Sequence, residues 1–210
     1  MKFRTLLAPT LASILTAVVV AQAQVPGVNS TLQAVFNLVY DASTMKPTYS
    51  AAGAVTPAAG ATDICSLSGS ATKNVRVRRI ILTGQISTAA NEPVSILKRS
   101  TANSGAGTAL TKVAYDSTNS LTNSTTNTST VNKAEVWTGV VTQGTLVGEL
   151  ADIHAFFSTS TTQAQQTIFE FGQRGSPVVL RGIAQQISVS LDGQGGGTGT
   201  LLCTFEWTEE

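Results

Sequence analysis

Few side chains in this sequence could carry out acid–base or nucleophilic chemistry. His154 is the only histidine, and alternation along a strand would place it on the face opposite Ile153, Ala155 and Phe157. A serine nucleophile activated by histidine would have to use His154, but no Gly-x-Ser-x-Gly turn leading into a helix is present. The pattern therefore favours an ordinary strand histidine over a catalytic one.

Carboxylates are equally sparse. Glycoside hydrolysis needs two carboxyl groups facing each other across a cleft, and the chain has 12 acidic residues in 210. Most of them fall at strand ends or turns, and no pair stands out among the candidates, which are Asp63, Glu92, Asp116, Glu135, Glu149, Asp152, Glu170, Asp192 and Glu206. We therefore expect no catalytic residues and no enzymatic activity.

Cofactor and metal motifs are not found in the sequence. The glycines between 193 and 199 precede a strand pattern, whereas a phosphate-binding loop opens a helix. One histidine and two distant cysteines do not fit the ligand spacing of a zinc site. The sequence predicts no cofactor and no metal.

Two cysteines, Cys65 and Cys203, lie near opposite ends of the region that reads as folded. In an oxidising compartment they could form a disulfide that closes a long loop. They could equally be two small buried apolar side chains on strands. The sequence leaves both possibilities open.

The charge composition argues against a nucleic-acid partner. Only 12% of the residues are charged and the formal net charge is +1, so no basic surface of the usual kind is expected. The strongest basic run, Arg76-Val77-Arg78-Arg79, alternates partly with apolar residues and is typical of the outer face of a strand.

The first 23 residues resemble a secretory signal peptide. Lys2 and Arg4 precede an uncharged run over 5–20, and Ala21-Gln22-Ala23 fits a cleavage site. The segment is either cleaved on export or retained as an anchor in an assembly. Its apolar run is short for a bilayer, which needs about 20 residues, so no stable membrane span is expected.

The remaining chain divides into an arm over 24–60, which is interrupted by glycine and proline, and a β-rich domain over 61–210. Short strands are predicted over 63–67, 74–86, 93–99, 133–141, 150–157, 167–171, 177–181, 186–191 and 201–207. The phase slips at Arg78-Arg79, which indicates a bulge or a change of sheet. The last two strands alternate apolar and polar residues and should each have one solvated face. A hairpin tip at Asp192–Gly199 would join them, and the Ser/Thr/Asn-rich run 117–130 is predicted to be a loop.

About eight to ten short strands predict an all-β fold. The expected architecture is an antiparallel two-sheet sandwich, jelly-roll-like in the broad sense. Aromatic side chains often anchor protein interfaces, and Trp137, Phe156 and Phe157 are the candidates for a contact patch.

Four blocks of this sequence resemble a group of small proteins of tailed bacteriophages. The first is Thr62-Asp63-Ile64 with the run 68–77, and the second is the run 97–105, Leu-Lys-Arg-Ser-Thr-Ala-Asn-Ser-Gly. The third is Phe169-Glu170-Phe171-Gly172 followed by Val179-Leu180-Arg181-Gly182, and the fourth is Glu206-Trp207-Thr208-Glu209-Glu210. The resemblance covers about 62–210. It implies a β-sandwich virion component, such as a capsid decoration, neck or fibre-associated protein, and it brings no catalytic residues.

The expected function is therefore structural. The chain would act in a phage virion through interfaces with other capsid or tail subunits and with copies of itself. The alternative is a secreted β-sandwich that binds or adheres, for example to carbohydrate, and the signal-like segment favours that alternative.

Overall fold

The computed structural model describes residues 46–88, 90–116, 132–159, 165–172, 177–195 and 199–210. The chain divides into two compact units, Met1–Met45 and Lys46–Glu210, and every described residue belongs to the second. The signal-like segment 1–23, the first part of the predicted arm and the predicted loop 117–130 lie outside the described residues.

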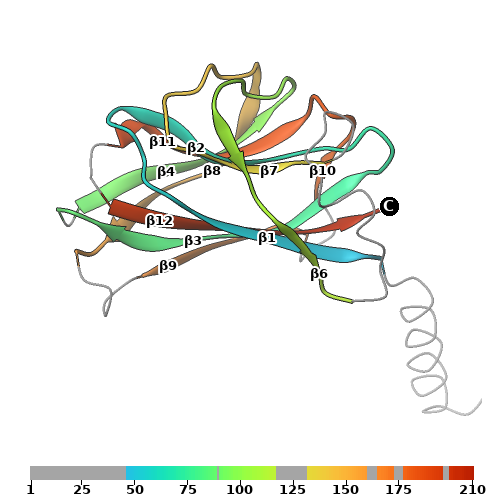
Figure 1. Cartoon of the computed structure of the whole chain (residues 1–210), viewed down its shortest axis with the longest axis horizontal. Helices are drawn as coiled ribbons and strands as arrows, with labels where there is room; N and C mark the ends of the chain where they lie inside the picture. The colour runs from blue at the N-terminus through green and yellow to red at the C-terminus, as the bar shows by residue number, and fades with distance from the viewer. Residues whose placement is uncertain (1–45, 89, 117–131, 160–164, 173–176, 196–198) are drawn as a thin grey trace, which may run out of the picture. The chain divides into compact units, whose positions relative to one another are not determined.

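The described strands form two antiparallel sheets of six that pack face to face (Figure 1). The first sheet contains β1 (Thr48–Val55), β3 (Val75–Ile86), β6 (Lys112–Ala114), β9 (Gln166–Glu170), β10 (Val178–Leu180) and β12 (Gly199–Glu209). The second contains β2 (Ala61–Ser68), β4 (Ala90–Arg99), β5 (Gly107–Ala109), β7 (Ala134–Trp137), β8 (Leu146–Phe157) and β11 (Gln186–Gly195). The predicted antiparallel sandwich is confirmed. A search of these residues for a helix long and apolar enough to cross a membrane found none.

The core lies between the sheets and is built by alternation. Leu201, Cys203, Phe205 and Trp207 of β12 all point inward and are almost fully buried. From the second sheet, Ile187, Val189 and Leu191 of β11 belong to the same buried cluster. Burying an aliphatic or aromatic side chain of this size contributes about 1.5–3 kcal/mol, which is why the apolar period of these two strands predicted their inner faces correctly.

The slip in phase at Arg78-Arg79 is a β-bulge. Arg79 pairs with Glu206 and Val77 pairs with Trp207, so Arg78 is an extra residue without a partner on β12. The bulge lets Val77 and Ile80 both reach the core although they are an odd number of positions apart.

The strand pairs are nested. The pair β1–β12 encloses β2–β11, which encloses β3–β9, which in turn encloses β4–β8. The short strands β5, β6 and β7 are inserted between β4 and β8. They extend both sheets on their other side, where β6 pairs with β1 and β7 pairs with β2. β10 also pairs with β3, beyond the residues that pair with β9. The jelly-roll part of the prediction stays a prediction.

The predicted arm over 24–60 is wrong at its end, because β1 lies inside it and pairs on both sides, with β12 and β6. Glycine and proline misled the prediction. Pro47 stands just before β1, and its carbonyl accepts a hydrogen bond from the Glu209 amide at 3.1 Å. Gly53 leaves room for Leu110, because a Cβ at Gly53 would lie 2.2 Å from a methyl group of that side chain.

The predicted hairpin tip at Asp192–Gly199 is also wrong. β11 and β12 belong to different sheets, and β11 continues to Gly195, which pairs with Ala61 of β2. Asp192 and Gly193 both have positive φ, 51° and 76°, and mark an irregularity within β11. Residues 196–198 of the predicted tip lie outside the described residues.

Candidate functional site

The outer side of β11 and β2, in the middle of the second sheet, is polar and yet buried. Gln186, Ser188 and Ser190 of β11 alternate with the core residues and were expected to face solvent, but all three are inaccessible. On β2, Ser66 and Ser68 point the same way and are buried too. The prediction of a solvated face is therefore wrong for β11, and other segments of the chain must cover its polar side.

Two crossing segments, 100–106 and 138–145, form that cover. Segment 100–106 leads from β4 past β11, β2 and β7 to β5 at the edge of the sheet, and segment 138–145 leads from β7 back past β2, β11 and β4 to β8. The two crossing segments are paired, since Ser104 and Thr142 exchange backbone hydrogen bonds of 2.9 Å in both directions. They run so close together that a Cβ at Gly144 would lie 1.8 Å from the carbonyl oxygen of Thr101.

A buried ion pair anchors this cover. Arg99 at the end of β4 donates two hydrogen bonds of 2.9 Å to the carboxylate of Asp63 on β2, and the side chains are 3% and 0% exposed. Asp63 also accepts hydrogen bonds from Asn103, at 2.6 Å, and from Gln143, at 3.2 Å. Arg99 donates a further bond of 2.8 Å to the carbonyl of Gly144. Each crossing segment is thus tied to one buried carboxylate, which is the arrangement a buried charge requires.

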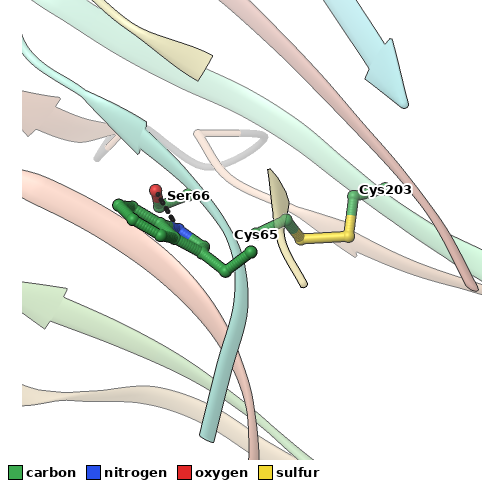
Figure 2. Close-up of a disulfide and its surroundings, with 4 residues drawn as sticks. Cys65, Ser66 and Cys203 are labelled. Atoms are coloured by element: carbon green, nitrogen blue, oxygen red, sulfur yellow. Dashed lines mark hydrogen bonds between the residues drawn. A yellow bond between two sulfur atoms is a disulfide. The ribbon is translucent and has the colours of Figure 1, made fainter. Parts of the chain in front are cut away.

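Amide and hydroxyl groups complete the network. Gln186 donates to the hydroxyls of Ser66 and Ser68, at 3.0 and 3.1 Å, and its oxygen accepts the Asn103 amide at 2.9 Å. The indole of Trp137 donates to Ser66 at 3.0 Å (Figure 2). These bonds hold the cover down through groups whose polarity is satisfied internally.

Cys65 lies next to Ser66 on β2 but points the opposite way, into the core, where it forms a disulfide with Cys203 of β12 (Figure 2). The two Cα atoms are 6.5 Å apart and 138 positions apart in sequence. The bond therefore joins the two sheets through the middle of the sandwich.

An open groove of about 650 Å³ lies on the outer face beside the crossing segments. Its lining includes Arg99, Gln143 and the three carboxylates of Glu149, Asp152 and Asp192. The Ser95 hydroxyl lies 2.6 Å from the Asp192 carboxylate and 3.4 Å from that of Asp152, so two acidic groups converge on one hydroxyl.

The chemistry of this groove is that of hydrogen bonding. Carboxylate oxygens accept bonds from hydroxyl groups, and an amide such as that of Gln143 both donates and accepts. Over the described ranges, no three His, Cys, Asp or Glu side chains stand close enough to hold a metal ion. The groove therefore has the groups to bind a polar ligand rich in hydroxyls.

Of the three aromatic residues predicted to form a contact patch, only one is exposed on the surface, where a partner could contact it. Trp137 is 2% exposed and Phe157 is 1% exposed, whereas Phe156 is 41% exposed. Alternation along β8 turns Phe157 into the core, and Trp137 is drawn under the cover by its bond to Ser66. The patch as predicted is corrected to Phe156 alone.

The basic run lies on the outer face of β3, as its pattern indicated, and opposite charges meet it there. Arg79 donates to Glu206 at 2.6 Å, and Arg76 bonds Glu210. Burial alone would raise the pKa of Glu206, but hydrogen bonds from Arg79 and Tyr115 outweigh this effect and lower the pKa below its usual value.

His154, the histidine that the sequence predicted to be an ordinary strand residue, is exposed on the outer side of β8, opposite Pro93 of β4.

Sequence reasoning missed the buried network, although a signal for it exists. Asp63 begins the predicted strand 63–67, and Arg99 ends the predicted strand 93–99. A charge inside a buried strand needs a partner of opposite sign, so Asp63 and Arg99 could have been matched from the sequence.

Comparisons of the chain with protein-family models, with curated proteins and with solved structures gave no match.

Proposed function

We propose that this chain is a non-enzymatic structural protein of a phage virion, a capsid decoration, neck or tail- or fibre-associated component. It acts through protein–protein interfaces in a repeated assembly, with other virion subunits and with copies of itself. Its mechanism is the burial of surface between subunits rather than turnover of a substrate.

The observation that carries the proposal is where the four phage-like blocks lie in the fold. The first two blocks supply Asp63, Arg99 and Asn103, which bond one another in the buried network. The third block covers the ends of β9 and β10, the fourth covers the end of β12, and all three strands pair with β3. The blocks that carry the resemblance therefore contribute to the buried network and to the pairing around β3, and we take this as support for a shared architecture with those phage proteins.

The nesting of the strand pairs gives further support. A first strand paired with the last, and so on inward to a central hairpin, is the order expected of a jelly roll. That architecture is found in viral capsid domains and in lectins. We take the sandwich to be a jelly roll with an insertion of β5, β6 and β7 between its fourth and fifth strands.

Peptide mass spectrometry of gradient-purified particles tests the proposal. We expect peptides of 46–210 in constant ratio to the major capsid protein across the particle peak, because a structural component has a fixed copy number. A soluble host protein of similar abundance, which should not follow the peak, is the control. Absence from particles, with a chain beginning at Gln24 in the medium, would contradict the virion assignment.

A secreted binding module is the second candidate, and two observations favour it. The disulfide between Cys65 and Cys203 is typical of proteins that mature in an oxidising compartment. The groove beside Asp152 and Asp192 offers oxygen acceptors to a ligand with many hydroxyls, such as a glycan.

A glycan array tests this second candidate. If it holds, the natural chain binds a defined set of glycans, and the double variant Asp152→Asn/Asp192→Asn loses at least about tenfold in affinity, because charged acceptors form stronger hydrogen bonds than neutral ones. Glu92→Gln, which removes one carboxylate elsewhere on β4, should bind normally. Failure of the natural chain to bind any glycan would contradict the candidate.

A further inference from the structure

Within the described part of the chain, the strand β8 has one edge without a pairing strand. Among the described residues it pairs only with β4, so it ends the second sheet on that side. It is 12 residues long, whereas β5 at the opposite edge has three. The free side of such a strand presents backbone N–H and C=O groups that another strand can pair with.

The second half of β8 is self-complementary. The run 150–156 reads Leu-Ala-Asp-Ile-His-Ala-Phe. When two copies pair antiparallel about Ile153, Leu150 faces Phe156, Ala151 faces Ala155, Asp152 faces His154 and Ile153 faces itself. Leucine thus faces phenylalanine, and alanine faces alanine. Because the pair is two-fold symmetric, the Asp152 carboxylate of each copy faces the His154 imidazole of the other, and the imidazole can donate a hydrogen bond to it.

The side chains concerned are accessible. Leu150 and Phe156 are each 41% exposed, and Asp152 and His154 are exposed as well. The irregularities in the β4–β8 pairing fall at Leu150 and before it. From Ala151 to Phe157 the strand is therefore regular and suited to extend the sheet.

We propose that two copies of this chain pair along β8, antiparallel and centred on Ile153, so that their second sheets join into one continuous sheet. A two-fold interface of this kind requires a surface that is complementary to itself, and the run 150–156 has that property. The inference rests on the proposal that the chain works in a repeated assembly, and it names one of the contacts.

Neighbouring registers match less well. Centring on His154 would set Asp152 against Phe156, and centring on Asp152 would set that carboxylate against its own copy. Like charges directly opposite each other destabilise a pair of strands. The register centred on Ile153 avoids both conflicts.

Sedimentation of the purified full chain over a concentration series tests the dimer. We expect the natural chain to dimerise and His154→Asp to weaken the dimer at least about tenfold, because two pairs of like charges then face each other. The swapped variant Asp152→His/His154→Asp should restore it. Val140→Asp, which adds a charge at an exposed residue outside β8, should dimerise normally.

Each outcome is decisive. A monomeric natural chain, or a dimer unaffected by His154→Asp, overturns the β8 contact, and loss without rescue by the swap overturns the register. A failed dimer is distinguishable from a failed virion assignment, because the first is measured on purified chain and the second on particles.

A cysteine cross-link tests the register separately. Ile153→Cys should form a disulfide-linked dimer on mild oxidation, because residues directly opposite on paired strands have Cβ atoms about 4.5–5.5 Å apart. Ala151→Cys faces residue 155 of the other copy and should stay monomeric on a non-reducing gel. Equal cross-linking of both variants, or of neither, overturns the pairing about Ile153.

Discussion

Replacing both Cys65 and Cys203 by alanine is expected to lower the free energy of unfolding by about 5 kcal/mol. The disulfide closes a loop of 138 positions, and the chain-entropy model assigns about that value to a loop of this length. In a domain of this size the melting temperature should fall by roughly 10–20 °C, which calorimetry or thermal circular dichroism measures.

Reduction gives a matched control for this prediction. A reducing agent should lower the melting temperature of the natural chain toward that of the double variant, and it should leave the variant unchanged. If the double variant has the same melting temperature as the natural chain, the disulfide between the sheets does not constrain the unfolded state, and the prediction is wrong.

The second large effect is expected at the buried ion pair. Arg99→Met should lower the free energy of unfolding by about 3–5 kcal/mol, because it leaves the Asp63 carboxylate buried without a positive charge. Asp63→Asn/Arg99→Met should recover part of that loss, since it removes both charges and keeps an oxygen acceptor for Asn103. Urea unfolding of the two single variants and the double variant measures the coupling.

Arg79→Met is the control for that series. Arg79 pairs with Glu206 on the surface, and its side chain is 37% exposed, so the loss should stay below about 1 kcal/mol. If Arg99→Met costs no more than Arg79→Met, the ion pair at Asp63 does not hold the crossing segments in place.

The sequence predicted the strands whose side chains alternate strongly. Each of the nine predicted runs overlaps a strand, because period-two apolar residues can satisfy a sandwich core in only one way. β1 was missed because its Ala, Ser and Gly residues give little strand propensity, and it is held by β12 on one side and β6 on the other. Its stability comes from partners distant in sequence.

The candidate site was harder to predict for the same reason. Gln186, Ser188 and Ser190 read as a solvated face, and local pattern could not reveal that segments 100–106 and 138–145 would cover them. Asp63 and Arg99 are 36 positions apart and share no local motif. Contacts that close loops of this length are set by topology, which a pattern of neighbours in sequence does not encode.

The position of β12 has a consequence for shortened forms of the chain. β12 lies between β1 and β3 in the first sheet. Without it, β1 and β3 would each present an open edge where β12 now pairs. A product that stops before Gly199 would expose both of those edges to its neighbours and is expected to aggregate.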